Sequence, residues 1–243
     1  IARIAAKLAI GFSLDELIND VTKSTPASFE PTIDYIVTKI PRFTFEKFSD
    51  TEDTLGTAMK SIGECMAIGR NFKESFQKAI RSLEIGLSGL NKPENLFNKT
   101  KKQLLSLLED NRPNKFLIIA ECFRQNISIN KVILKSKYDP WFVREINDII
   151  KIETSLKKKK FDLALYLKAK ANGFSDKRIA QIINKKELFL ENFKTKNNLH
   201  SCFKNIDTCS GEFKSFTPYM YSTWNNIESS TLFEDETKVT SKK

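Results

Sequence analysis

The spacing of hydrophobic residues over the second half of the chain is that of a helical protein. From about residue 93, apolar side chains recur every three or four positions. Interruptions fall at Pro113, Pro140, Gly173 and Asn184, residue types that commonly end helices. No alternating strand pattern of useful length occurs, so we expect this half to be all-α. The predicted helices cover residues 93–110, 114–126, 128–137, 139–156, 160–172, 175–184 and 186–197.

The first half shows a more mixed pattern. Residues 1–10 combine Ile, Ala and Leu with two basic side chains, which favours a mostly buried helix. Ser13 and Glu16 have the spacing of a capping box and predict a short helix through Val21. Residues 34–40 are rich in β-branched and aromatic side chains, so they predict a strand. We expect this strand to stop at Pro41, which lacks an amide donor.

A strongly amphipathic helix is predicted after Asn71, whose side chain is a good N-terminal cap. Its polar face would include Glu74, Gln77 and Lys78. Its apolar face would hold Phe72, Phe76, Ala79, Ile80 and Leu83.

The segment that follows the helices has irregular spacing. Residues 202–224 contain several aromatic side chains without a helical period, and they predict a loop-rich wrap. From about residue 235 the chain turns polar and charged, as is typical of a linker or a cut end.

Charge divides the chain into two parts. With 243 residues, 40% hydrophobic and 29% charged, the chain has the profile of a soluble globular protein, of one large domain or two unequal ones. Residues 1–84 hold 11 Lys and Arg against 12 Asp and Glu, whereas the rest holds 29 against 18. This shift supports a domain boundary near Glu84. No run approaches the about 20 apolar residues of a membrane span, and we expect no signal peptide.

The cysteines and the histidine do not suggest a metal site. None of the four cysteines forms a CxxC pair, and His200 is the only imidazole. We therefore expect free thiols, as in a reducing compartment, and a structural role for His200. The thiols are Cys65, Cys122, Cys202 and Cys209.

Two basic features raise a nucleic-acid alternative. Lys157–Lys160 forms a cationic cluster, which we interpret as a solvated helix end rather than a surface for nucleic acid or membrane. Residues 175–197 have the outline of a helix-turn-helix. However, its second helix would begin with Glu187 and Glu191, which oppose phosphate binding. A helix-turn-helix-type nucleic-acid-binding domain stays the alternative function.

Three motifs carry a resemblance to a known family. In chain order, the first motif is Pro26-Ala27-Ser28-Phe29-Glu30-Pro31. The second is Asp34-Tyr35-Ile36-Val37-Thr38-Lys39-Ile40-Pro41-Arg42-Phe43, and the third is Met59-Lys60-Ser61-Ile62-Gly63-Glu64. Tyr219-Met220-Tyr221-Ser222-Thr223-Trp224 closes the match, which spans about residues 1–226. In this order and spacing the motifs resemble the large chain of carbamoyl-phosphate synthetase, where its first ATP-grasp unit ends and its helical oligomerisation domain begins.

The resemblance implies a mostly α fold with a small α/β remnant. Residues 1–84 would be the end of the first ATP-grasp unit, residues 85–235 the all-α oligomerisation domain, and residues 236–243 a linker or cut end. The chain begins at Ile1 rather than Met, which we interpret as a fragment boundary. The enzyme makes carbamoyl phosphate from bicarbonate, glutamine-derived ammonia and ATP, for pyrimidine and arginine biosynthesis. A cytoplasmic location is expected, and an organelle is compatible with the sequence.

The same resemblance assigns a site and partners. The whole enzyme would use ATP and Mg²⁺, but the Glu-x-Asn-x-Arg and Gly-rich phosphate motifs do not occur in this chain. We therefore expect it to bind no cofactor or metal, to supply no catalytic residue and to be inactive alone. Glu64 matches the glutamate that lines the carbamate passage, and Met59 would share that wall. The alternative for Glu64 is a structural carboxylate. Partners would be the remainder of the large chain, a glutaminase subunit or domain, and further copies through Leu96, Leu104 and Leu108; nucleic acid and membrane would not be partners.

Overall fold

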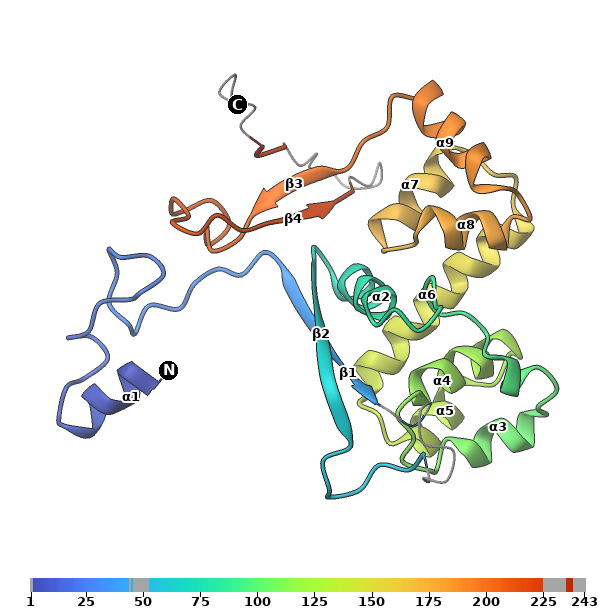
Figure 1. Ribbon diagram of the computed structural model, residues 1–243, viewed down its shortest axis with the longest axis horizontal. Helices are drawn as coiled ribbons and strands as arrows, with labels where there is room; N and C mark the ends of the chain where they lie inside the picture. The colour runs from blue at the N-terminus through green and yellow to red at the C-terminus, as the bar shows by residue number, and fades with distance from the viewer. Residues whose placement is uncertain (1, 44, 46–52, 225–234, 238–243) are drawn as a thin grey trace.

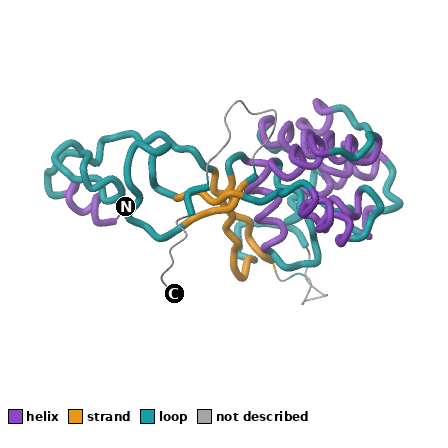
Figure 2. Tube along the Cα trace, turned by 90° about the horizontal axis from the view of Figure 1, so that it is seen from above, coloured by secondary structure: helices purple, strands orange, loops and turns teal. Residues whose placement is uncertain are grey.

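The computed structural model describes residues 2–43, 45, 53–224 and 235–237. An N-terminal arm leads into a two-stranded sheet. Helix α2 (Phe72–Ser82) lies between this sheet and the other helices, which form a helical body (Figure 1). The strands lie between the arm and the helices (Figure 2). The protein is mostly α, as predicted.

The first part of the N-terminal arm (residues 2–35) lies apart from the helical body (Figure 1). It begins with α1 (Ala2–Ala9), a helix without buried residues, so the prediction of a mostly buried helix is right about the helix and wrong about its burial. Residues 13–21 form turns instead of the predicted helix. The Ser13 amide and hydroxyl both donate to Glu16 Oε2, at 2.8 and 3.0 Å. The hydroxyl therefore does not serve as the acceptor that would cap a first helical turn.

The sheet consists of β1 (Ile36–Phe43) and β2 (Ser61–Gly69), which run antiparallel. The predicted strand is present, but it continues through Pro41, which pairs with Glu64. Among the described residues β1 has only one neighbouring strand. An edge strand tolerates proline where the missing amide would face away from the partner, so the expectation that Pro41 ends the strand is wrong.

Helix α2 joins the sheet to the helical body. Asn71 caps it as predicted, because its Oδ1 accepts the Glu74 amide at 2.9 Å. One side of α2 faces the sheet, where Thr38 Oγ1 and Ser75 Oγ are 2.7 Å apart. The other side contributes Phe76 and Ile80 to the core of the helices. A single helix therefore ties both parts together.

The helical body follows the predicted breaks closely, except near residue 93. There the predicted helix is replaced by the short 3-10 helix η1 (Glu94–Leu96) and by α3 (Lys101–Leu107), which Thr100 caps. The ends of the remaining helices agree with the predicted ranges to within three residues. They are α4 (Lys115–Arg124), α5 (Ile129–Ser136), α6 (Pro140–Lys158), α7 (Leu163–Ala171), α8 (Asp176–Ile182) and α9 (Glu187–Lys196).

The core of the helical body is built around α4 and α6. Ile119, Ile146 and Ile149 are nearly inaccessible to solvent, and Leu104 and Leu108 join the same cluster. Leu96 is also buried. The expectation that Leu96, Leu104 and Leu108 form a surface for self-association is therefore wrong, because these side chains stabilise the interior of this chain.

A β-hairpin follows the helices, where a loop-rich wrap was expected. Strands β3 (Cys202–Asn205) and β4 (Met220–Thr223) pair antiparallel and lie beside the end of α2 (Figure 1). Residues 206–219 connect them, with loop backbone at Asp207 and Cys209 in the left-handed region. The strands are only four residues long, so their alternation was too short to detect from sequence.

Candidate functional site

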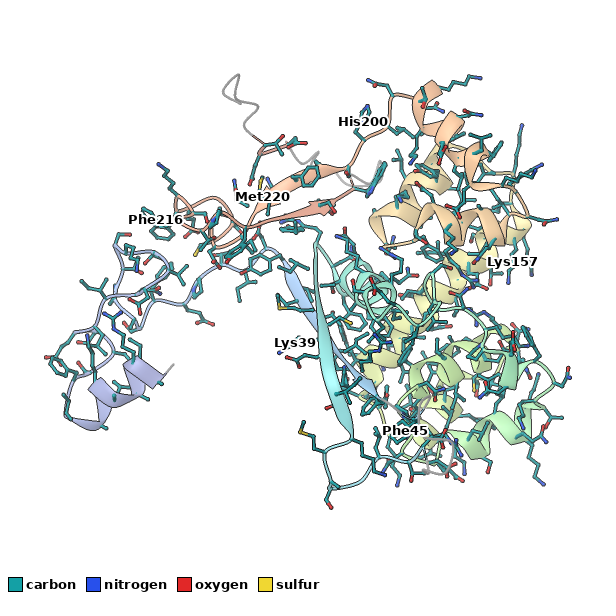
Figure 3. All side chains as sticks on the ribbon, viewed as in Figure 1. Lys39, Phe45, Lys157, His200, Phe216 and Met220 are labelled. Carbon is teal, nitrogen blue, oxygen red and sulfur yellow. The ribbon has the colours of Figure 1, made fainter. Side chains whose placement is uncertain are left out.

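The predicted passage residue Glu64 lies on β2 and forms an ion pair. Its Oε1 is 2.5 Å from Lys39 Nζ, and both side chains are about half-exposed, at 56% and 55%. Lys39 lies on the neighbouring strand and points away from the helices (Figure 3). A carboxylate among apolar side chains is unfavourable unless it is paired, and Lys39 supplies that partner. The pair faces outward from the described chain.

The second predicted residue, Met59, lies just before β2 and is 89% exposed. A large apolar side chain this open contributes nothing to the core of the described chain. Neither the passage role of Glu64 nor that of Met59 is tested by these positions, so both stay predictions.

The sheet that carries Glu64 has one covered and one open face. Thr38 and Cys65 point toward α2, where Cys65 Sγ lies 3.5 Å from the Ala79 carbonyl. On the opposite face Val37, Ile62 and Met66 remain 43%, 59% and 60% exposed around the Lys39–Glu64 pair. A two-stranded sheet with an exposed apolar face is marginally stable alone. We call the side chains of Val37, Lys39, Ile62, Glu64 and Met66 the open sheet face.

The buried carboxylate of Glu74 fixes the end of this sheet. It is 1% exposed and accepts hydrogen bonds from the Arg70 amide at 2.7 Å and from Thr223 Oγ1 at 3.0 Å. Lys78 Nζ lies 2.8 Å from its other oxygen and also donates to the Ser222 carbonyl. Glu74 therefore joins β2, α2 and β4.

Glu74 falls on the polar face of the predicted helix, but other parts of the chain cover that face, so its side chain is buried. Gln77, predicted on the same face, is also buried, and its Nε2 donates to the Asn172 carbonyl at 2.7 Å. Helical periodicity shows which side of a helix is polar but not whether another part of the chain covers that side. No signal in the sequence marks these two polar residues as buried.

Two glycines allow the backbone to approach Glu74 closely. A Cβ at Gly69 would lie 2.7 Å from the Ser75 amide nitrogen, and one at Gly173 would lie 2.7 Å from Glu74 Cα. Gly173 also has a φ of +87°, which side chains disfavour. The turn between α7 and α8 can therefore pack directly on α2, where Arg81 donates to the Gly173 carbonyl at 2.6 Å.

A second buried charge cluster lies inside the helical body. Glu153 on α6 is 2% exposed and receives hydrogen bonds from Arg124 and Arg178 at 2.8 and 2.9 Å. Burial by itself would raise the pKa of Glu153, but the Arg124 hydrogen bond and the two guanidinium charges outweigh it and lower the pKa to about 2. The cluster fastens α4, α6 and α8 to one another and has the form of a structural network.

The cysteines and His200 are separated in the structure. All four thiols are free, and burial raises the pKa of Cys122 to about 12, which opposes reactivity. His200 is exposed between α9 and β3 (Figure 3), with Nε2 3.1 Å from Asn198 Oδ1. Within the described ranges, no three His, Cys, Asp or Glu side chains gather in a way that could hold a metal ion.

Among the residues that the structure describes, no helix is both long and apolar enough to cross a membrane. Helices α8 and α9 are present, as the helix-turn-helix alternative requires, and Glu187 and Glu191 are exposed on α9.

The fold defines a class of protein: a mostly helical protein with a small α/β part. A family model described as "Carbamoyl-phosphate synthetase large chain, oligomerisation domain" matches residues 64–198. The chain belongs to the carbamoyl-phosphate synthetase large-chain family.

Named relatives agree with this assignment. The chain is 50% identical over 233 residues to the carbamoyl phosphate synthase large chain of Buchnera aphidicola, and 48% identical over 228 residues to that of Haemophilus ducreyi. It is 46% identical over 224 residues to an Aquifex aeolicus protein named as the N-terminal section of that large chain. Each match covers 92% of this chain.

The chain spans only part of these relatives. It covers 21% of the Buchnera and Haemophilus proteins and 40% of the Aquifex section. It therefore corresponds to a fragment of the large chain. Nothing in these relatives' names favours the nucleic-acid alternative.

Proposed function

We propose that this chain serves within a carbamoyl-phosphate synthase large chain as the joint between the first ATP-grasp unit and the helical oligomerisation domain. The whole enzyme would make carbamoyl phosphate from bicarbonate, glutamine-derived ammonia and ATP. The chain would contribute structure and position rather than reacting groups. The observation that carries this proposal is α2, which binds the Glu64-bearing sheet on one side and the helical core on the other.

The remainder of the large chain would cover the open sheet face. Apolar side chains as exposed as Ile62 and Met66 gain free energy when another surface removes them from water. In that setting the Lys39–Glu64 pair would line the wall of a polar passage rather than face bulk solvent. A carboxylate at such a wall would keep the passage hydrated and accept hydrogen bonds from the amino group of carbamate. Met59 would form an apolar part of the same wall.

The proposal also assigns the chemistry to other parts of the enzyme. ATP and Mg²⁺ would bind outside this chain, which would be inactive alone, and a glutaminase subunit or domain would supply ammonia. Self-association would use exposed apolar side chains of the helical body, such as Phe97 and Leu134, which are 55% and 76% exposed.

A chimera tests the proposal. The Buchnera large chain, with its matching segment replaced by this chain, should form carbamoyl phosphate from bicarbonate, glutamine and ATP when combined with its glutaminase. The 243-residue chain alone should not hydrolyse ATP in the presence of bicarbonate. A folded chimera without synthesis, or ATP hydrolysis by the chain alone, would contradict the proposal.

A further inference from the structure

A small apolar cleft with a basic rim lies where α6 ends against the turn between α8 and α9. Its volume is about 330 Å³, enough to admit one large side chain. Lys157, Lys159 and Lys185 stand at its edge. Lys157 marks this end of α6 in Figure 3. The apolar residues that line it are Leu156, Phe161, Ile182, Ile183 and Phe189.

Most of the positive charge at this rim is uncompensated. Lys157 reaches inward to Glu153, with 2.8 Å between Nζ and Oε1. Lys159 and Lys185 have no acidic partner among the described residues, and Lys185 Nζ lies 6.0 Å from the centre of the Phe189 ring. Lys158, Lys160 and Lys186 are exposed beside them in the sequence. The acids on the adjoining helix are Glu187 and Glu191, both exposed.

The fold alone accounts for only some of these lysines. Cations in the last turn of α6 stabilise that helix through its dipole. Lys185 and Lys186, in contrast, directly precede the N-terminus of α9, where positive charge is unfavourable. Lys186 occupies the N-cap position and makes no side-chain capping hydrogen bond. A bound anion would interact favourably both with Lys185 and Lys186 and with the N-terminus of α9.

We propose that this basic cleft binds an acidic segment of another protein, with one large apolar side chain of that segment inserted between Phe161, Ile183 and Phe189. The lysines at the rim would pair with carboxylates on either side of the inserted residue. A second copy of this chain fits poorly, because each copy carries a net charge of +10. Nucleic acid also fits poorly, because its phosphate backbone offers no aliphatic side chain to fill the apolar cleft.

Two labelled peptides test the proposal by fluorescence anisotropy on the 243-residue chain. Both contain three Asp or Glu residues on each side of a central position, which is Leu in one peptide and Ser in the other. The Leu peptide should bind about tenfold more tightly, because burying the leucine adds apolar contact. In the double variant Lys159→Glu/Lys185→Glu, binding of both peptides should be lost.

A matched double variant, Lys101→Glu/Lys102→Glu, changes the net charge equally on exposed residues of α3. It should retain the Leu peptide's advantage, and circular dichroism should show that both variants are folded. Equal affinity for the two peptides, or equal loss of binding in the two double variants, would mean general attraction of polyanions and would overturn the proposal. Tighter binding of duplex DNA than of the Leu peptide would overturn it in favour of nucleic acid.

Discussion

Two single residues, Glu64 and Glu74, are both paired with lysine. Their contributions to the free energy of unfolding should differ, because one carboxylate is exposed and the other is buried. Glu64 pairs with Lys39 in contact with water, where an ion pair contributes little to stability. Glu74 is 1% exposed and holds the Arg70 amide, the Thr223 hydroxyl and Lys78 together. Its removal would leave buried donors without an acceptor.

Glu74→Ala should therefore lower the free energy of unfolding by about 3 kcal/mol. Glu64→Ala is the matched control and should cost less than about 1 kcal/mol. Urea denaturation followed by circular dichroism measures both. Similar losses in the two variants would contradict the structural role of Glu74.

The Glu153 cluster predicts a pH dependence. The pKa of this carboxyl falls from its ordinary value of 4.5 to about 2 on folding. A carboxyl with a depressed folded pKa stabilises the fold above its unfolded pKa, and that stability is lost as pH falls toward the folded pKa. Wild type should therefore lose stability between about pH 4.5 and pH 2.

In Glu153→Gln, part of this acid dependence should disappear, because glutamine does not titrate. The variant should be less stable than wild type at pH 7, where Arg124 and Arg178 lose the Glu153 carboxylate and Arg124 keeps only Glu121, at 3.6 Å. Urea denaturation at pH 7 and pH 3 should show a smaller difference at pH 3. A difference of the same size at both pH values would argue against the cluster as its source.

At the scale of elements, close packing of the α7–α8 turn on α2 depends on Gly173. Gly173→Ala combines a positive φ with a Cβ placed 2.7 Å from Glu74 Cα. Gly86→Ala is the matched control, because Gly86 has a φ of +79° but nothing within 4 Å of its added Cβ. We expect about 1 kcal/mol of destabilisation at Gly86 and at least about 3 kcal/mol at Gly173. Thermal unfolding would show the difference, and equal shifts in midpoint would contradict the packing argument.

The helices were predictable because their capping residues and the spacing of their apolar residues are local features of the sequence. Asn71 and Pro140 set helix starts, and a repeat of three or four residues follows each of them. The hairpin of β3 and β4 was not predictable, because each strand has only four residues and β4 is held by hydrogen bonds with Glu74 and Lys78 of the distant helix α2. Strand β2 has glycines at Gly63 and Gly69, which weaken a strand pattern.

The candidate site was predictable only in part. The motif around Glu64 identified the family, but its pairing with Lys39 depends on the register of two strands, and sequence spacing does not give that register. Burial of Glu74 likewise depends on β4, which follows it by about 150 residues in the chain. Interactions of this kind become visible only when the fold brings distant segments together.

In the whole molecule, the helical body has a closed apolar core, whereas the sheet is covered on only one face by the described residues. In the isolated chain, amides of β1 and β2 should exchange hydrogen faster than those of α4 and α6, because the described residues cover only one face of the two-stranded sheet. In the full-length large chain the same strand amides should exchange more slowly. Unchanged exchange in β1 and β2 would contradict the idea that the remainder of the large chain covers the open sheet face.

We propose that Glu64 serves the transfer of carbamate and not the chemistry at either ATP site. The most direct test substitutes Glu64→Ala in the chimeric large chain and measures bicarbonate-dependent ATP hydrolysis beside carbamoyl phosphate formation. Glu109→Ala, which removes another exposed carboxylate of an ion pair, is the control. We predict that Glu64→Ala lowers carbamoyl phosphate formation roughly tenfold while bicarbonate-dependent ATP hydrolysis persists. Equal loss of both activities, or no loss of either, would rule out this role of Glu64.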